Sequence, residues 1–305
     1  MAKSAPVDVR VGNRTLRLTN LDKVFWPETG FSKADMIDYY TRVAPAILPH
    51  LKDRPLTLKR YPDGVEGQMF YEKNCPKHRP PWVETATVWS GGNQRDMDYC
   101  LVQDLASLVW VAQLGTVELH TSLSLRDPLD RPRSMVFDLD PGPSATIVEC
   151  CQVALWLREW FDSKNLQTLC KTSGSKGLQL YMPINSPVDY AATKTISKGL
   201  AEAMEREHHD LVVSRQTKTL REGRVLIDWS QNDEHKTTVN VYSLRARSRP
   251  TVSTPVSWEE VEKCHRSGEP QDLVFEASQV LQRIERHGDL FEPVAELRQK
   301  LPKEV

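Results

Sequence analysis

The sequence of 305 residues lacks any long apolar run. In its most apolar region, the longest stretch without Asp, Glu, Lys or Arg is Leu105 to Val117, which has 13 residues. A membrane-spanning helix needs about 20. The first residues, MAKSAPVDVRVG, also lack the uninterrupted apolar segment of a secretory signal. We therefore expect a chain that has no membrane span and stays in the cytoplasm, where it is made.

Cysteine pairs, glycine and repeated sequence are also scarce. The six cysteines include no C-x-x-C pair, and Cys150 and Cys151 are adjacent, so the spacing indicates neither a zinc site nor a disulfide framework. Cys75 and His78 lie close together, but two ligands cannot complete a tetrahedral zinc site. We expect small, buried, structural cysteines. With only 14 glycines, no internal repeat and no long Gly/Ser linker, the chain is expected to be compact throughout.

Charge is abundant but unevenly distributed, although the net charge is only −1. Residues 214–249 contain eight Lys or Arg against four Asp or Glu, whereas residues 257–305 contain seven basic and eleven acidic residues. A basic segment within a neutral chain is compatible with a polyanion held in one groove. Taken alone, a solvated basic hairpin explains the same feature more simply.

Strand-like and helix-like patterns interleave along the chain. Ser32 and Asp35 form a capping box that begins a helix, and we expect Pro49 to end this helix near Leu48. Further helices are predicted at 104–114, 146–161, 191–207, 258–265 and 277–286. Strands are predicted at 16–19, 56–61, 68–72, 116–121, 133–140, 169–172, 178–182, 224–229 and 237–242. Several strands arrive as hairpins, which favours an α+β fold over a parallel doubly wound sheet.

The sharpest local signal is the sequence Asp138-Leu139-Asp140. Positions i and i+2 of a strand share a face, so the two carboxylates project side by side and repel each other unless a cation lies between them. Asp228, in an apolar strand, is a third acid that would be costly to bury unpaired. Three such carboxylates are the minimum ligand set for two Mg²⁺ or Mn²⁺ ions. For an isolated D-x-D, a strand that simply ends at the following turn is the simpler interpretation.

A second signal is the small-residue turn 172–177, TSGSKG, between two predicted strands. Its backbone N–H groups, the hydroxyl of Ser173 and the ammonium of Lys176 suit a phosphate chain. The G-x-x-x-x-G-K-[ST] spacing of a Walker A loop is missing, and no helix follows. An ordinary flexible hairpin is an equally good interpretation of the turn alone.

Other candidates carry weaker signals. His120 shares the polar face of its predicted strand with Glu118, yet lone histidines are usually surface or satisfied core residues. Two neighbouring aromatics should point to opposite faces of a strand, so at most one of them reaches the core and the other is free to stack on a base. The two aromatics are Phe70 and Tyr71. Two early lysines, Lys23 and Lys33, flank Trp26 and would ordinarily only solubilise the surface.

Together and in order, these motifs resemble the polymerase domain of bacterial DNA ligase D, a branch of the archaeo-eukaryotic primase superfamily that serves non-homologous end joining. The resemblance covers roughly residues 16 to 290. It rests on the segments 18–24, 26–33, 70–73, 80–82, 118–120, 136–142, 172–178, 218–221, 227–232, 236–238 and 242–245. It implies a primase-superfamily catalytic core, an α+β fold with antiparallel and mixed sheets flanked by helices.

The resemblance also implies a role for each matching residue. The metal-binding catalytic residues, for two ions of Mn²⁺ or Mg²⁺, would be Asp138, Asp140 and Asp228. The nucleotide-binding residues would be Ser173 and Lys176 on the triphosphate, with His120 near the sugar, Arg221, Lys236 and Arg245. The DNA-binding residues would be Lys23 and Lys33 on a 5′-phosphate, with Phe70 and Tyr71 facing the template. The family favours ribonucleotides.

We therefore expect residues 1–305 to form one polymerase domain that extends or gap-fills DNA ends with a recessed 5′-phosphate. Its partners would be a template strand, NTP or dNTP, a Ku-type end-binding protein and a ligase, in the nucleoid-associated cytoplasm. The ligase and phosphoesterase domains that usually accompany such a domain have no room here, so the chain would be a stand-alone relative or an excised domain. Alternatives are a primase-polymerase of broader repair, a primase, and a non-catalytic module that binds DNA ends.

Overall fold

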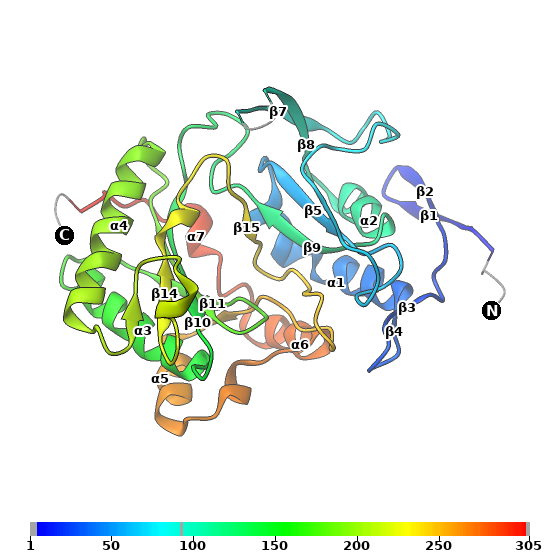
Figure 1. Cartoon of the computed structure of the whole chain (residues 1–305). Helices are drawn as coiled ribbons and strands as arrows, with labels where there is room; N and C mark the ends of the chain where they lie inside the picture. The colour runs from blue at the N-terminus through cyan, green and yellow to red at the C-terminus, as the bar shows by residue number, and fades with distance from the viewer. Residues whose placement is uncertain (1–4, 92–93, 303–305) are drawn as a thin grey trace.

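The computed structural model describes residues 5–91 and 94–302 (Figure 1). Within these residues the chain forms two six-stranded sheets, which lie side by side. The first sheet has the order β13 (Val212–Val213), β14 (Val225–Asp228), β10 (Ser134–Pro141), β12 (Leu178–Pro183), β11 (Leu169–Thr172) and β16 (Pro255–Val256). Its neighbouring strands are antiparallel except β13 and β14, which are parallel.

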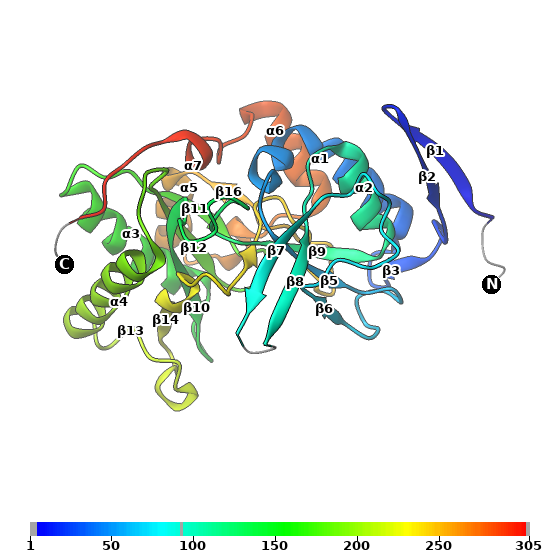
Figure 2. The same cartoon turned by 90° about the horizontal axis from the view of Figure 1, so that it is seen from above.

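The second sheet has the order β15 (Thr238–Val239), β9 (Thr116–Thr121), β5 (Leu56–Arg60), β8 (Arg95–Cys100) and β7 (Thr85–Ser90), and β6 (Phe70–Glu72) pairs with β5. Two small antiparallel pairs lie outside these sheets: β1 (Val7–Val11) with β2 (Arg14–Leu18), and β3 (Val24–Trp26) with β4 (Phe31–Ser32). Figure 2 shows the β1–β2 hairpin at the edge of the molecule.

Helices cover the outer faces of the two sheets. The described helices are α1 (Lys33–Leu51), α2 (Leu105–Gln113), α3 (Ile147–Asp162), α4 (Tyr190–Glu207), α5 (Trp258–Ser267), α6 (Ala277–His287) and α7 (Pro293–Glu296), with short 3-10 turns η1 (Lys218–Leu220), η2 (Trp229–Gln231) and η3 (Pro270–Leu273). In Figure 1, α3, α4 and α5 gather beside the first sheet, whereas α1 and α2 pack with the second. No helix of the described chain is long and apolar enough to cross a membrane.

The alternation of β10 determines where the acidic residues face. Met135, Phe137 and Leu139 point into the core that the first sheet forms with α3, α4 and α5, and all three are fully buried. Asp138 and Asp140 therefore point the other way, toward the second sheet. The fold thus places the acidic pair between the two sheets, where residues from both sheets can reach it.

Most predicted elements are confirmed to within about two residues, and the α+β class is confirmed. Two boundaries were wrong. Helix α1 continues through Pro49 to Leu51, because a proline in the last turn removes one backbone hydrogen bond while the buried face of the helix still anchors it. Strand β15 ends at Val239 rather than at Tyr242, where the backbone turns to φ 64°. The β7–β8 hairpin was not predicted.

The prediction of six unpaired cysteines was also wrong. Cys75 and Cys100 form a disulfide, with their Cα atoms 4.9 Å apart. The backbone N–H of Cys75 donates to the carbonyl of Asp98, which docks the segment after β6 against β8. Sequence spacing could not predict this pairing, because it depends on the docking of two segments 25 residues apart. The other four cysteines are free and buried, as expected.

Candidate functional site

The centre of the candidate site is a pair of acids on adjacent strands. Asp138 of β10 lies directly opposite Asp228 of β14 in the antiparallel ladder, and opposite Gln179 of β12 on its other side. Asp140 follows two residues later on the same face as Asp138. The strand register thus places three acids on two adjacent strands, although Asp138 and Asp228 are 90 residues apart in the sequence.

These carboxylates sit in an electrostatic environment that resists their ionisation. Burial raises the pKa of Asp138 to about 7, and the charges of Asp140 and Asp228 add to this effect. Burial and the charge of Asp228 likewise raise the pKa of Asp140. Asp228 is partly satisfied locally, because its carboxylate accepts hydrogen bonds from the Ser230 N–H at 3.0 Å and from Gln231 Nε2 at 3.0 Å. A cation is the species that would relieve the remaining repulsion.

A buried lysine that was not among the predicted site residues lies beneath the acids. Lys171 is fully buried, and its Nζ donates to Gln179 Oε1 at 2.5 Å, to Ser253 Oγ at 2.7 Å and to the Val239 carbonyl at 3.1 Å. Gln179 in turn donates to Asp138. Burial lowers the pKa of Lys171 to about 7, while the charge of Asp138 opposes that change. Lys171 thus links both sheets and provides a countercharge near Asp138.

The turn 173–177 lies directly against the acidic strand. A Cβ on Gly177 would lie only 2.0 Å from the carbonyl oxygen of Leu139, between the two acids, so only glycine allows this approach. The Ser173 hydroxyl accepts hydrogen bonds from the N–H groups of Ser175 and Gly177, both at 3.2 Å, which closes the turn. Lys176 is exposed, and its ammonium has no hydrogen-bond or ion-pair partner in the described part of the chain.

Arginines from the segment after β15 hold the same turn. Arg245 donates to the Ser173 carbonyl, and Arg247 donates to the Ser175 hydroxyl. Arg221 enters from the other side, where its guanidinium donates to the Gln216 carbonyl at 2.9 Å. The resulting cavity has a volume of about 360 Å³. Of the predicted residues, it is lined by His120, Asp138, Asp140, Ser173, Lys176, Arg221 and Arg245.

A second residue that was not predicted, Glu118, organises the cationic wall. Its buried carboxylate accepts a hydrogen bond from His120 Nε2 at 2.8 Å, and it forms ion pairs with Lys59 at 3.2 Å and Arg245 at 3.3 Å. Burial raises the pKa of Glu118, but the hydrogen bond from His120 and the charges of Arg245, His120 and Lys59 outweigh it and hold that pKa well below its usual range. Burial lowers the pKa of His120 despite the opposing effect of Glu118.

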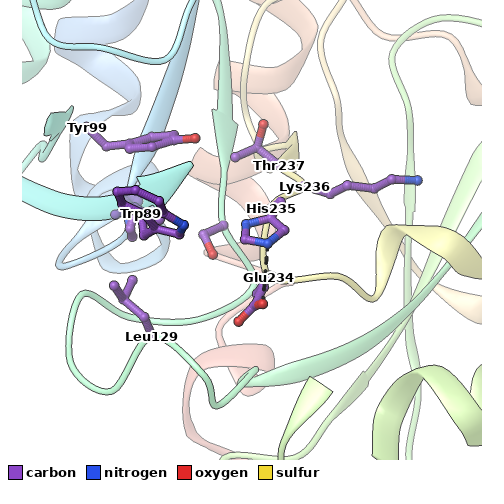
Figure 3. Close-up of a pocket in the computed structure, with 10 residues that line it drawn as sticks. Trp89, Tyr99, Leu129, Glu234, His235, Lys236 and Thr237 are labelled. Atoms are coloured by element: carbon purple, nitrogen blue, oxygen red, sulfur yellow. Dashed lines mark ion pairs between the residues drawn. The ribbon is translucent and has the colours of Figure 1, made fainter. Parts of the chain in front are cut away.

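Lys236 lies at the border of a neighbouring cavity of about 270 Å³. Figure 3 shows Trp89, Tyr99, Leu129 and His235 around this cavity, while the Lys236 side chain extends away from it. The ammonium of Lys236 donates to Ser230 Oγ at 2.6 Å, beside Asp228. Thr237 lines both cavities, which are therefore adjacent.

The two predicted aromatics lie on β6, which pairs only with β5 in the described chain. Phe70 and Tyr71 are both exposed, so neither contributes to the core. The Tyr71 hydroxyl lies 3.2 Å from Thr237 Oγ1, and the Tyr71 ring lies 6.3 Å from the His120 ring between centroids. Tyr71 is thus at the rim of the acidic cavity.

Lys23 and Lys33 form a separate cationic pair away from the acids. The N–H of Lys33 donates to the Lys23 carbonyl at 2.8 Å, which fixes the two backbones side by side. Lys33 is 5% exposed, and its Nζ donates only to the Thr19 carbonyl among the described residues. Lys23 Nζ donates to the Pro62 carbonyl at 2.7 Å and to Asp63. Burial, followed by the charges of Lys23 and Arg60, lowers the pKa of Lys33 to about 8.

The donor set around Asp138 fits a divalent cation in its chemistry. Within residues 5–91 and 94–302, no three His, Cys, Asp or Glu side chains converge closely enough to hold a metal ion as they stand. The Asp228 carboxylate is turned toward η2, which it caps through Ser230. Oxygen ligands alone, mutual repulsion and the raised pKa of Asp138 are nevertheless the features that Mg²⁺ or Mn²⁺ matches.

An α+β core with strand-borne acids that face a cationic cavity is typical of proteins that handle phosphorylated substrates. Comparison with known proteins narrows this class. A family model described as the LigD primase-polymerase domain matches residues 32–291. A solved structure of the polymerase domain from Mycobacterium tuberculosis ligase D in complex with DNA is similar, with a TM-score of 0.84 and 37% identity over 93% of this chain and 99% of that one.

Full-length relatives agree with this result. The multifunctional non-homologous end joining protein LigD of Mycolicibacterium smegmatis is 37% identical over 281 residues, which are 92% of this chain and 36% of the relative. The bifunctional non-homologous end joining protein LigD of Bacillus subtilis is 28% identical over 274 residues, which are 90% of this chain and 43% of the relative. The chain thus spans less than half the length of these relatives. It belongs to the LigD primase-polymerase domain family, and the predicted family is confirmed.

Proposed function

We propose that this chain is a template-dependent nucleotidyltransferase that extends or gap-fills DNA ends in non-homologous end joining. The observation that carries the proposal is the direct cross-strand pairing of Asp138 with Asp228, with Asp140 beside them. Clustered acids weaken binding to a polyanion, and a cluster that is partly buried also destabilises the fold, so a module that only binds DNA ends gains nothing from them. An enzyme that positions cations on a triphosphate does gain from them.

In this proposal Asp138, Asp140 and Asp228 hold two divalent cations, Mn²⁺ or Mg²⁺. When bound, such cations activate a primer 3′-hydroxyl and neutralise the negative charge of the triphosphate and pyrophosphate. The chain itself supplies the position and orientation of the carboxylates through the β10–β14 register. Lys171 donates to Gln179, which donates to Asp138, and the positive charge of Lys171 would reduce the repulsion among the carboxylates.

The incoming nucleotide would occupy the cavity of about 360 Å³. Its triphosphate would lie against the turn 173–177, where the Lys176 ammonium, unpaired among the described residues, and Arg221 and Arg245 provide positive charge. Lys236, whose ammonium donates to Ser230 beside Asp228, would add a further positive charge for the nucleotide. Arg and Lys side chains that converge on one cavity suit the several charged oxygens of a triphosphate.

His120 supports a preference for ribonucleotides. Its Nε2 faces the ionised carboxylate of Glu118, which can only accept, so Nε2 carries the proton. Because burial lowers the pKa of His120, the ring is neutral near pH 7 and Nδ1 remains an acceptor. A 2′-hydroxyl is a donor that could meet Nδ1, and a deoxyribose has none.

The proposed DNA contacts follow from the exposed aromatics and the paired lysines. Phe70 and Tyr71 would stack on template bases at the rim of the cavity. Lys23 and Lys33 would bind the recessed 5′-phosphate, since two ammonium groups near each other suit a dianion. Ku-type end binding and a ligase would act on the same DNA ends. The complex of the similar mycobacterial polymerase domain with DNA supports this part of the proposal.

Primer extension on a gapped duplex tests the proposed function. The assay compares Mn²⁺, Mg²⁺ and chelator, templates of different sequence, and each nucleotide type. We expect addition of the nucleotide complementary to the template base, only when a divalent cation is present. DNA binding without any cation-dependent addition would assign the chain to the class of end-binding modules instead.

A further inference from the structure

A second cationic cavity lies at the other end of strand β10. It has a volume of about 240 Å³ and is formed by the connection between β9 and β10, the residues after β12, and the residues after α7. Three arginines line it: Arg131, Arg133 and Arg298. None of the polymerase residues considered so far belongs to this cavity.

The three guanidinium groups have no acidic partner in the part of the chain that the structure describes. The side-chain contact of Arg133 is a donation from Nε to Asn185 Oδ1 at 2.8 Å, which leaves its terminal nitrogens available. Burial lowers the pKa of Arg133, and the nearby charge of Arg298 adds to this effect. The two arginines are therefore close enough to repel each other without a neutralising carboxylate.

A further arginine adds to the positive field from inside. Arg54 is half-buried, and its Nη1 donates to the carbonyls of Ser122 and Leu123 at 3.1 and 2.7 Å rather than to a carboxylate. Burial lowers the pKa of Arg54 to about 10, and the charge of Arg133 is one of the groups that lower it. A fixed anion in the cavity would offset this excess of positive charge.

The wall of the cavity is held in place by hydrogen bonds. Asn185 Nδ2 donates to the carbonyls of Val294 and Leu297 at 3.0 and 2.8 Å, so the residue that orients Arg133 also anchors the segment after α7. Gln299 binds the same region through its N–H, which donates to the Ile184 carbonyl at 2.9 Å. Arg298 therefore emerges from a fixed backbone, which favours binding over free movement in solvent.

The position of the cavity relative to the acids sets a spacing. Arg133 immediately precedes β10, and Asp138 lies five residues further on. At about 3.3 Å per strand residue, the two Cα atoms are about 16 Å apart. This distance equals the rise of about five base pairs of duplex DNA. The cavity lined by Trp89 and Thr237 lies next to the acidic cavity and includes Leu129, so the β9–β10 connection borders both this cavity and the arginine cavity.

We propose that Arg131, Arg133 and Arg298 bind a backbone phosphate of the primer–template duplex, about five base pairs behind the growing 3′ end. This inference rests on the proposed polymerase function and adds a contact that fixes the DNA behind the acids. In Figure 1, β3, next to the paired lysines, and α7, next to the arginine cavity, lie on opposite sides of β9 and β15, so the two cationic sites would hold the DNA on both sides of the reaction centre.

A nucleic-acid phosphate fits this cavity better than an acidic peptide. Planar guanidinium groups match the paired oxygens of a phosphate, and arginine is the residue type that binds phosphates through two parallel bonds. The connection between β9 and β10, which carries Arg131 and Arg133, also contributes Leu129 to the cavity beside the acidic site, where a nucleic-acid strand would already lie. The distance of the cavity from Asp138 therefore predicts which phosphate of the duplex is bound. An acidic peptide has no fixed distance from the growing 3′ end, so it gives no such prediction.

The test is a double-mutant cycle between protein and DNA. One partner is the protein with Arg131→Ala/Arg298→Ala, two exposed residues whose loss should leave the fold intact. The other is a gapped primer–template with neutral methylphosphonate linkages at about four to six base pairs behind the 3′ end. Matched controls are Arg206→Ala/Arg286→Ala, which removes the same charge from exposed helix positions, and DNA with the neutral linkages about ten to twelve base pairs behind the 3′ end.

We expect either change alone to weaken binding about tenfold, and both together to weaken it little more than one, because each removes the same contact. The controls should leave binding within about twofold. The slope of log affinity against log salt should fall by about one for the arginine variant. A thermal melt equal to that of the wild type shows that the variant is folded.

Four outcomes overturn the inference. In the first, the wild type extends primers but binds DNA with equal affinity wherever the methylphosphonate linkages are placed. This result would exclude the proposed phosphate contact and leave the polymerase function intact. Fully additive effects of the two changes would place the arginines elsewhere on the DNA. Loss of binding to a glutamate-rich peptide with unchanged DNA binding would make the cavity a peptide site. Failure of the wild type both to bind and to extend DNA would overturn the proposed function as well.

Discussion

Glu118 accepts a hydrogen bond from His120 two residues along the same strand, across 2.8 Å. The same carboxylate forms ion pairs with Lys59 and Arg245, which come from β5 and from the segment after β15. One buried anion therefore holds three positively charged or proton-donating groups from three parts of the chain. This arrangement makes Glu118 a positioning residue of the candidate site.

Removing this anion should destabilise the protein in a pH-dependent way. Glu118→Gln should lower the free energy of unfolding at pH 7 by about 3 kcal/mol, because it leaves cations without their partner. The pKa of Glu118 is lower in the folded state than in the unfolded state, so its stabilising effect is present above about pH 4.3 and disappears as the pH falls. Urea unfolding at pH 7 and near pH 3 measures the difference. Glu159→Gln, on an exposed position, is the control, and an equal loss at both pH values contradicts the prediction.

Removing one acidic carboxylate should stop catalysis without preventing DNA binding. Asp138→Asn and Asp228→Asn keep the side-chain size and remove one anionic ligand each. We expect primer extension to fall at least about 100-fold, since even outer partners of metal ligands cost 10–100-fold when lost. Binding to gapped DNA should be retained or slightly tighter, because an anion near a polyanion is removed. Asp162→Asn, an exposed acid on α3, is the control. Near-normal extension by either folded variant would exclude these acids as ligands.

Loss of His120 should narrow the preference for ribonucleotides. In the unmodified protein we expect ribonucleotides to be added at least as efficiently as deoxyribonucleotides, measured as kcat/KM for both nucleotide types on one template. His120→Ala removes the acceptor that would meet the 2′-hydroxyl, so the ratio should move toward one. His209→Ala, an exposed histidine, should leave the ratio unchanged. A strong deoxyribonucleotide preference in the unmodified protein would count against the assigned role.

Affinity for a recessed 5′-phosphate should depend on the paired lysines. Lys23→Ala with Lys33→Met keeps the buried stem of Lys33 while removing both charges. Each charge-assisted bond to a terminal phosphate contributes about 1.5–3 kcal/mol when well formed. The wild type should therefore bind phosphorylated ends more tightly than unphosphorylated ends, and the double variant should not distinguish them. Lys52→Ala with Lys164→Ala removes the same charge elsewhere. Equal affinity of the wild type for both ends would show that the two lysines do not bind the 5′-phosphate and have only a structural role.

Reduction of the Cys75–Cys100 disulfide should lower stability measurably. The bond closes a loop of 25 residues that contains the β7–β8 hairpin, and cross-links of this size contribute about 3 kcal/mol. Unfolding without a reductant, followed by alkylation and mass spectrometry, should label four cysteines, and unfolding with a reductant should label six. Cys75→Ser should reproduce the loss of stability in the absence of a reductant. Six labels without any reductant would show that the two thiols are unpaired.

Local features of the site were predictable from the sequence because they depend on neighbouring residues. The alternation of β10 placed Asp138 and Asp140 on one face, and the same rule placed Glu118 beside His120 on β9. The bounds of β9 and β11 were predicted correctly, since both are short strands with clear turns on each side. The significance of Glu118 could have been inferred from that shared face, because an acid beside a histidine on a strand that is buried on both faces needs a partner.

The remaining features were decided by contacts between distant segments. The register of β14 against β10 sets Asp228 opposite Asp138, and nothing near either residue specifies it. The burial of Lys171 depends on the docking of β15 and Ser253 over β11, so its sequence alone reads as an ordinary strand lysine. The arginine cavity likewise joins three connections that are far apart in the chain. Backbone periodicity determines which face a side chain takes, whereas the packing of one sheet on another determines what that face meets.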